Sequence, residues 1–171
     1  KRLYSSPSNR ELASLVFNKL KQKFVHMKYS SKHFDQWLLK FDFRDDISSS
    51  FWRYKTITPP ADRFWADPHI IFRDDRYFIY IEEYLYSTQK GHISVLEIKE
   101  DGSYTEPETV LKTDYHLSYP FVFEHNGETY MIPESIENRT VELYRCVKFP
   151  NKWEFVKNLM ENVDLLDVTL H

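Results

Sequence analysis

The sequence contains few of the residues that cross-link or sharply bend a small domain. Only one cysteine, Cys146, is present among 171 residues, so the chain cannot form an internal disulfide. Nothing therefore argues for an oxidising compartment, and we predict a cytoplasmic location. Only three glycines are present, which counts against a sandwich built from many tight glycine turns.

Several functional classes lack their usual signature. No apolar run approaches the length of a membrane span, and no signal peptide is visible. The seven histidines show no His-x-x-x-His spacing, and the chain has neither a glycine-rich phosphate loop nor a Gly-x-Ser-x-Gly motif. The net charge of −3 gives no case for nucleic acid. We expect no cofactor, and only a structural calcium bound by carboxylates stays open.

The charge that is present is unevenly distributed. Residues 1–28 hold seven basic side chains against one acidic side chain, whereas the rest of the chain holds 16 basic and 25 acidic. Ser8-Asn-Arg-Glu11 fits a helical capping box, and apolar residues follow at helical spacing, which predicts an amphipathic helix from Ser8 to about His26. We assign residues 1–34 to a basic helical leader or linker that packs on the body or on an upstream domain. The alternative is contact of this helix with a membrane surface.

Aromatic residues are abundant instead, with 12 Tyr, 13 Phe and 4 Trp. Such side chains favour strands, where they suit a pleated and half-buried surface. Their faces also pack on pyranose rings. After Phe34 the pattern changes to short apolar runs, and we predict the first strands at Trp37–Phe43 and Trp52–Ile57.

Two predicted hairpins repeat along the chain. One has strands His69–Phe72 and Arg76–Ile81 around Asp74-Asp75, and the other surrounds Asn126-Gly127, a strong turn signal. They superpose with an offset of 52 residues, which aligns Asp67 with Tyr119 and Glu82 with Glu134. The further predicted strands are Phe121–Glu124, Glu128–Ile132, His92–Ile98, Thr140–Cys146, Thr109–Lys112 and Trp153–Asn158. Asp167–His171 resembles the opening of another unit.

A period near 50 residues with four short strands per unit is typical of propeller blades. We predict an all-β fold, in which residues 35–171 form about three blades of a β-propeller preceded by the amphipathic helix. A β-sandwich is the structural alternative. Because a propeller needs at least four blades to close, we expect further blades or another domain of the same chain as partners.

The repeat brings acidic residues to one end of the hairpins. With two-residue turns, Asp67 should lie opposite Glu82, and Tyr119 opposite Glu134, while Asp167 opens the next unit at the same position. Opposed carboxyls repel when both are ionised, so one is expected to be protonated, bound to an arginine or ligated to a cation. Paired carboxyls are also the equipment of glycoside hydrolysis. The alternative is a set of solvated acids at strand ends.

Other residues near these strand ends are candidates for contacts with a ligand. We predict substrate binding by Glu82 and by its neighbour Glu83, which faces the other side of the strand. The remaining candidates precede the two inner strands: Arg63, Trp65, His116 and Tyr119.

These residues fall within motifs that resemble a group of proteins related to glycoside hydrolase family 43. The group includes the N-terminal domain of plant glucosamine inositolphosphorylceramide transferases and bacterial proteins in which a similar domain accompanies a formyltransferase-like region. The motifs are Asp62-Arg-Phe-Trp-Ala-Asp-Pro68, Glu82-Glu83, Lys90-Gly-His-Ile-Ser94, His116-Leu-Ser-Tyr-Pro-Phe-Val-Phe123 and Tyr130-Met-Ile-Pro-Glu-Ser135.

The resemblance implies a five-bladed propeller and a carbohydrate ligand. It matches Asp67 to the general base of family 43 hydrolases, makes Glu134 the nearest candidate for the acid, and leaves Asp167 to replace a tuning aspartate whose position holds Tyr119. We therefore predict a carbohydrate-active propeller that binds, and in the hydrolytic version cleaves, a glycan or sugar conjugate. The alternative is a non-catalytic glycan-recognition or scaffolding propeller beside a glycosyltransferase or formyltransferase domain.

Overall fold

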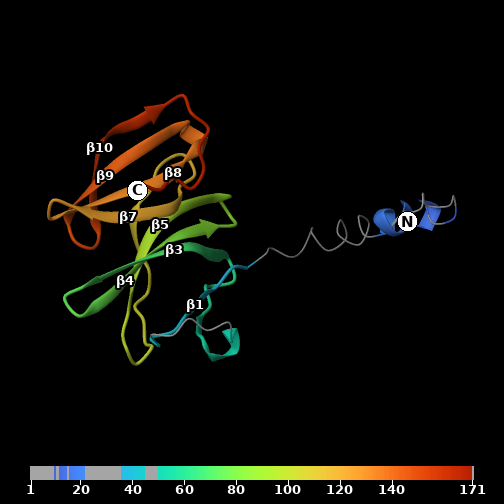
Figure 1. The fold of residues 1–171 in the computed structure, drawn as a ribbon, viewed down its shortest axis with the longest axis horizontal. Helices are drawn as coiled ribbons and strands as arrows, with labels where there is room; N and C mark the ends of the chain where they lie inside the picture. The colour runs from blue at the N-terminus through green and yellow to red at the C-terminus, as the bar shows by residue number, and fades with distance from the viewer. Residues whose placement is uncertain (1–9, 11, 15, 22–35, 45–49, 171) are drawn as a thin grey trace, which may run out of the picture. The chain divides into compact units, whose positions relative to one another are not determined.

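The computed structural model describes residues 10, 12–14, 16–21, 36–44 and 50–170 (Figure 1). The chain divides into two units, Lys1–Asp35 and Gln36–His171. All described residues of the first unit are helical, as the apolar spacing predicts, while the proposed cap Ser8 lies outside the described residues. No helix in the described part of the chain combines the length and apolar content needed to cross a bilayer.

The second unit is built from two four-stranded antiparallel sheets, in which neighbours in sequence are neighbours in space. The strands of the first sheet are β3 (Arg63–Arg73), β4 (Arg76–Leu85), β5 (Lys90–Ile98) and β6 (Glu108–Leu111). Those of the second are β7 (Ser118–His125), β8 (Glu128–Ser135), β9 (Thr140–Lys148) and β10 (Lys152–Glu161). The all-β class is confirmed, and the described sheets do not close into a ring.

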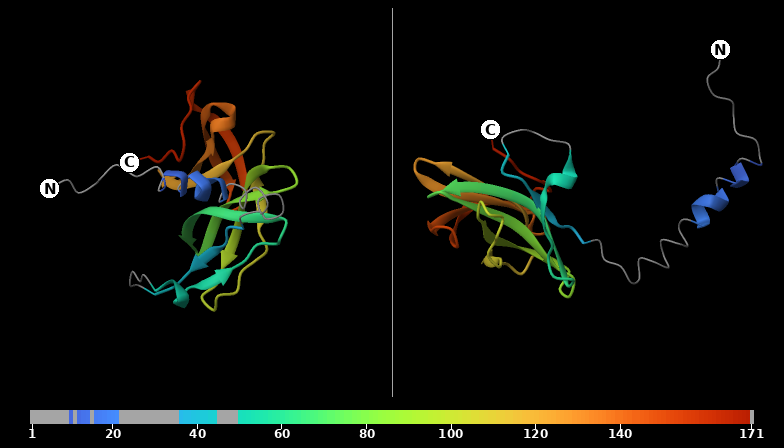
Figure 2. Two further views of the ribbon diagram at one scale, coloured as in Figure 1. Left: turned by 90° about the vertical axis from the view of Figure 1, so that its right-hand side faces the viewer. Right: turned by 90° about the horizontal axis from the view of Figure 1, so that it is seen from below.

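The two sheets lie side by side, with their first strands β3 and β7 next to each other (Figure 1 and Figure 2). A third, two-stranded sheet pairs β1 (Leu39–Phe41) with β2 (Lys55–Ile57). Both strands are shorter than the predicted Trp37–Phe43 and Trp52–Ile57. Strand β2 begins late because Phe51–Arg53 forms a turn of 3-10 helix, η1. A second 3-10 turn, η2 (Ile136–Asn138), joins β8 to β9.

Strand β4 is buried on both of its faces, which explains its long apolar run. On one face Phe78 and Tyr80 join a core cluster between the two large sheets, together with Val95, Leu117, Val122, Met131 and Tyr144. On the other face Ile79 and Ile81 join a second cluster with Trp65, Leu96 and Ile98. Leu39 and Ile57, from β1 and β2, complete this second cluster and so cover the outer face of the first sheet.

The hairpin turns follow the predicted register. Arg73 pairs with Arg76 across Asp74-Asp75, and His125 pairs with Glu128 across Asn126-Gly127. The predicted register is nevertheless wrong by one residue at the open ends, where Ala66, not Asp67, lies opposite Glu82.

A β-bulge causes this shift in the first sheet. Asp67 and Pro68 together stand opposite one residue of β4, between the pairs Ala66–Glu82 and His69–Tyr80. Proline has no N–H for the strand ladder, so inside strands it is largely confined to edges and bulges. Both conditions hold for Pro68, since β3 is the first strand of its sheet.

The second sheet repeats the bulge at Tyr119-Pro120, so that Ser118, not Tyr119, lies opposite Glu134. The backbone conformation also recurs: φ is 48° at Asp67, 41° at Tyr119 and 48° at Asp167. Non-glycine residues seldom adopt this region. The predicted strand at Asp167–His171 is absent from the described residues up to 170, although Asp167 takes the backbone conformation of the two bulges.

Candidate functional site

Four carboxyl groups, Asp67, Glu82, Glu134 and Asp167, gather at the open ends of the inner hairpins, and we call them the acidic rim. The backbone N–H of Tyr119 donates to Asp67 Oδ2 at 3.3 Å. The N–H of Asp167 donates to Glu134 Oε2 at 3.0 Å. The positive-φ residues Tyr119 and Asp167 thus each bind a carboxyl group of the preceding sheet, and this repeated arrangement brings the predicted acids together.

Glu82 is the most deeply buried member of the rim, with 6% of its surface exposed. Burial raises its pKa to about 8, and the charge of Asp67, a hydrogen bond with Asp67 and the charge of Glu134 contribute to the rise. At neutral pH Glu82 is therefore protonated and donates to Asp67. This agrees with the expectation that two facing carboxyls are not both ionised.

Glu134 stands in a milder version of the same environment. Burial raises its pKa, and the hydrogen bond from the Asp167 N–H opposes the rise. The nearby charge of Asp167 adds to the rise, whereas Ser118 offsets part of it. The rim consequently places the protonated carboxyl of Glu82 beside the carboxyl groups of Asp67, Glu134 and Asp167.

His116 supports the rim from the segment before β7. Its Nδ1 accepts the backbone N–H of Gly91 at 2.9 Å, so in the neutral ring Nε2 carries the proton. That nitrogen lies 3.4 Å from Glu82 Oε1. Burial lowers the pKa of His116, which favours the neutral form. Gly91 leaves room for this arrangement, because a Cβ there would lie 2.6 Å from Leu117 O and 2.8 Å from Glu82 Oε1.

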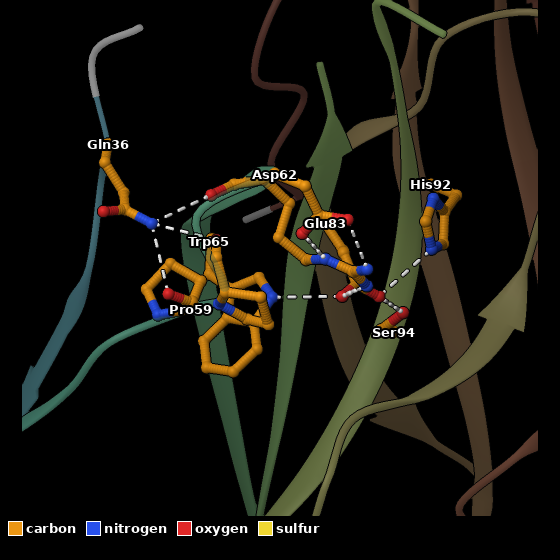
Figure 3. A network of polar contacts seen from close by, with 9 residues as sticks. Gln36, Pro59, Asp62, Trp65, Glu83, His92 and Ser94 are labelled. Atoms are coloured by element: carbon orange, nitrogen blue, oxygen red, sulfur yellow. Dashed lines mark hydrogen bonds and ion pairs between the residues drawn. The ribbon is translucent and has the colours of Figure 1, made fainter. Parts of the chain in front are cut away.

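Trp65 and Glu83 lie on the opposite face of the first sheet (Figure 3), and Arg63 bonds to Glu83 there, so these three predicted ligand contacts do not join the rim. The bulge places Trp65 directly opposite Glu83, and both side chains are almost completely buried. Glu83 Oε1 accepts from Arg63 Nη1 at 2.9 Å and from Trp65 Nε1 at 3.1 Å. Trp65 is thus a core residue with a polar contact, and it offers no open face for a sugar.

The second oxygen of Glu83 is equally well satisfied. Oε2 lies 3.1 Å from His92 Nε2 and accepts from Ser94 Oγ at 2.7 Å. Burial alone would raise the pKa of Glu83, but the hydrogen bonds from His92, Arg63, Ser94 and Trp65 outweigh it and lower the pKa to about 2. Glu83 is therefore ionised at neutral pH and acts as a structural carboxylate. The network continues through Gln36 Nε2, which donates to the carbonyls of Pro59 and Pro60 (Figure 3).

Glu142 is a second buried carboxylate that the sequence analysis missed. It lies on the face of the second sheet that contacts the first sheet, with 2% of its surface exposed. Hydrogen bonds reach it from four side chains: Tyr115, Asn138, Thr140 and Tyr144. Burial raises the pKa of Glu142, but these bonds outweigh it and the pKa is lowered. The available signal was the set of polar neighbours of Glu142 in the sequence: Asn138 and Thr140 precede it, and Tyr144 follows it on the same face of the predicted strand.

No group of three or more His, Cys, Asp or Glu side chains within the described ranges is arranged to hold a metal ion.

The chain matches a known protein family. Residues 55–170, more than half of it, match the family model described as "Glucosamine inositolphosphorylceramide transferase 1, N-terminal". The chain belongs to this family. The matched residues include both large sheets and the whole acidic rim, so the site lies inside the region that defines the family.

Individual relatives agree with the family match. The chain is 31% identical over 156 residues to glucosamine inositolphosphorylceramide transferase 1 of Oryza sativa subsp. indica, covering 85% of this chain and 21% of the relative. It is 37% identical over 108 residues to the Arabidopsis thaliana protein of the same name, covering 63% of this chain and 14% of the relative. The chain thus spans about a fifth or less of the length of these relatives. No solved structure matches it.

Proposed function

We propose that the second unit recognises a glycan or sugar conjugate at its acidic rim and accompanies a glycosyltransferase domain. Family membership supports the association with a transferase, since the relatives are named as transferases. The pairing of protonated Glu82 with Asp67 carries the proposal for the site. A carboxylic acid beside a carboxylate supplies a donor and acceptors at one place, which suits adjacent hydroxyl groups of a sugar ring.

The charge of the rim restricts which chemical groups a ligand can present to it. A phosphate group would meet like charges on Asp67 and on the neighbouring acids, whereas an ammonium group would meet opposite charges. The relatives are named for both glucosamine and inositolphosphorylceramide. Of these two chemistries the rim fits an amino sugar, and we propose a glucosamine-bearing glycan as its ligand.

We further propose that the two large sheets are successive blades of a five-bladed propeller. The recurrence of positive φ at Asp67, Tyr119 and Asp167 supports this arrangement, as does the contact of β3 with β7. Apolar side chains exposed on β10, including Phe155 and Val156, are available for packing against further structure. An experimental structure of the full-length protein with a different number of blades, or with a sandwich, would overturn this part.

The test of recognition uses the full-length protein, methyl glucosaminide as the probe, and isothermal titration calorimetry. Asp67→Asn keeps a residue that tolerates positive φ but removes the charge, and we expect at least a tenfold weaker affinity, or about 1.4 kcal/mol. Asp75→Asn is the matched control, because Asp75 also has positive φ (56°) but lies in the turn at the other end of the hairpin. Equal affinities of Asp67→Asn and wild type would sink the proposed site.

The same proteins distinguish recognition from catalysis. Aryl glycosides are offered to wild type, to Asp67→Asn and to Glu134→Gln, and release of the aryl group is followed. We expect no turnover by any of them. Turnover by wild type that both substitutions abolish would assign a hydrolase in place of a recognition domain.

A further inference from the structure

We propose that Phe64, Tyr84 and Tyr86 form an aromatic ledge that stacks against the apolar face of a pyranose ring, next to the acidic rim. This inference rests on the proposed function and assigns a second set of contacts to the same site. Phe64 and Tyr84 are cross-strand partners on β3 and β4. Their rings stack with centroids 4.7 Å apart and planes 7° apart. Tyr86 extends the group, with its centroid 6.3 Å from Phe64 and 6.4 Å from Tyr84.

The ledge continues the face of β4 that carries Glu82. Side chains two residues apart on a strand share a face, so Tyr80, Glu82 and Tyr84 follow one another on the same side. Tyr80 is fully buried in the core between the sheets, Glu82 is buried at the edge of that core, and Tyr84 is partly exposed. The face thus passes from core to rim to ledge, and Tyr84 lies about 7 Å along the strand from Glu82. One sugar residue can span this step.

His116 connects the ledge to the rim. Its ring centroid lies 5.8 Å from that of Tyr84, and its Nε2 lies 3.4 Å from Glu82 Oε1. Carbohydrate and cofactor sites combine apolar or aromatic walls with a few placed polar groups. The ledge supplies the wall, and Glu82 and Asp67 supply the polar groups for the hydroxyls on the edge of the same ring.

Phe64 and Tyr84 are half-buried at the margin of the fold, where a cross-strand pair stabilises the sheet and its rings stay partly accessible to a ligand. Neither Phe64 nor Tyr84 belongs to the two core clusters of the second unit. A comparable cross-strand pair, Phe72 and Tyr77, lies at the turn end of the same hairpin with its centroids also 4.7 Å apart. That pair is packed against Phe43, whose ring lies 5.1 Å from Tyr77. The turn-end pair therefore serves as a matched structural reference for the ledge.

The test measures binding of methyl glucosaminide to the full-length protein by calorimetry and by saturation-transfer NMR. We expect Tyr84→Leu, which keeps an apolar side chain but removes the ring, to weaken binding about tenfold and to abolish saturation transfer to one face of the sugar. Tyr84→Phe keeps the ring and should stay within twofold of wild type. Tyr77→Leu changes the reference pair and should leave the affinity unchanged even where it lowers the melting temperature.

A second arm separates a free glycan from a lipid-borne headgroup. Phosphatidylcholine vesicles with and without a glucosaminyl glycolipid are sedimented with the same proteins. Loss of vesicle binding in Tyr84→Leu, with no binding of the soluble glucosaminide by wild type, would assign the ledge to a lipid headgroup. The reverse pattern would assign it to a soluble glycan.

Different experimental outcomes would contradict the proposed aromatic ledge and the proposed function of the rim. If Tyr84→Leu and Phe64→Leu bind as wild type does while Asp67→Asn does not bind, the ledge is wrong and the proposed function stands. If wild type binds neither the soluble probe nor the vesicles, the proposed function is wrong and the ledge falls with it. Should Tyr84→Leu melt below the temperature of the assay, Phe64→Leu decides the question, because it removes the other half of the stack.

Discussion

Glu82 and Glu83 are adjacent in β4 and point to opposite faces of the same sheet, and the pKa values of their carboxyl groups are shifted in opposite directions. Burial, with the charge of Asp67, raises the pKa of Glu82 to about 8. Four hydrogen bonds overcome burial at Glu83 and lower its pKa to about 2. One step along a strand therefore separates a carboxylic acid suited to ligand binding from a carboxylate that supports the fold.

The first prediction concerns the support given by Glu83. Glu83→Gln leaves the Arg63 guanidinium without its buried carboxylate, and we expect a loss of roughly 2–3 kcal/mol in the free energy of unfolding. Urea denaturation at pH 7 measures this loss. Glu97→Gln is the control, because the ion pair of Glu97 with Arg76 is longer and more exposed, and such pairs contribute about 0–1 kcal/mol. A loss no greater than that of the control would contradict the structural role.

The contribution of Glu83 to stability should depend on pH. Because the folded-state pKa of Glu83 is depressed from 4.5 to about 2, its contribution is present above pH 4.5 and is lost as the pH falls toward 2. Wild type and Glu83→Gln should therefore converge in stability near pH 2. A constant difference between pH 7 and pH 2 would show that the carboxylate charge is not responsible.

The second prediction concerns Glu82, for which the sign is reversed. Its folded-state pKa lies at about 8, so between pH 4.5 and 8 the folded protein holds a proton that the unfolded chain has released. The contribution of Glu82 to stability consequently falls as the pH rises through this range. Glu82→Gln should flatten that fall and unfold at higher urea than wild type at pH 8. Glu124→Gln, an exposed carboxyl on β7, should leave the slope as in wild type.

The third prediction concerns the space at Gly91. In Gly91→Ala the new Cβ would meet the Leu117 carbonyl at 2.6 Å, and a backbone atom cannot move away without disturbing the link between the sheets. We expect a loss of about 1–3 kcal/mol, as for other overpacked sites, together with weaker glucosaminide binding. At Gly127, where no atom lies within 4 Å of the added Cβ, alanine should cost about 1 kcal/mol from its positive φ and leave binding intact.

The fourth prediction compares two tyrosine–glutamate hydrogen bonds. Tyr115 donates to buried Glu142 at 2.8 Å, whereas Tyr130 donates to exposed Glu128 at 2.6 Å. Tyr115→Phe should lower the free energy of unfolding by about 1.5–3 kcal/mol, since it removes a bond to a buried charge. Tyr130→Phe should change it by less than about 0.5 kcal/mol. Similar effects of the two substitutions would show that water replaces the Tyr115 hydroxyl.

The strands and turns could be predicted because local patterns determine them. Asp74-Asp75 and Asn126-Gly127 are two-residue turns between apolar runs, and the structure places the turns there. The offset of 52 residues between the hairpins, which relates Asp67 to Tyr119, reappears in the matching φ values of these residues. The all-β class followed from these signals.

The register at the site could not be predicted from alternation, because a bulge interrupts it. An available signal was overlooked: Pro68 and Pro120 recur at the same repeat position, immediately before the predicted strands His69–Phe72 and Phe121–Glu124. If the strands extend through these prolines, as β3 and β7 do, a bulge is expected there. The pairing of Trp65 with Glu83 followed from the shifted register, whereas alternation had already predicted that Glu83 faces away from Glu82. Three donors to Glu142, namely Asn138, Thr140 and Tyr144, lie within four residues of it in the sequence. Tyr115 comes from a distant segment, and only the packed structure shows its approach.

The bulge in β3 also links the mechanical behaviour of the two cores. Before the bulge, Trp65 belongs to the cluster under β1 and β2; after it, Ile71 packs against the cluster between the large sheets. One continuous strand is therefore anchored in both clusters, and neither can loosen without drawing that strand out of the other. Heat or denaturant should consequently unfold the two sheets in a single cooperative transition. A mechanical force applied to β3 should likewise unfold both core clusters in one step.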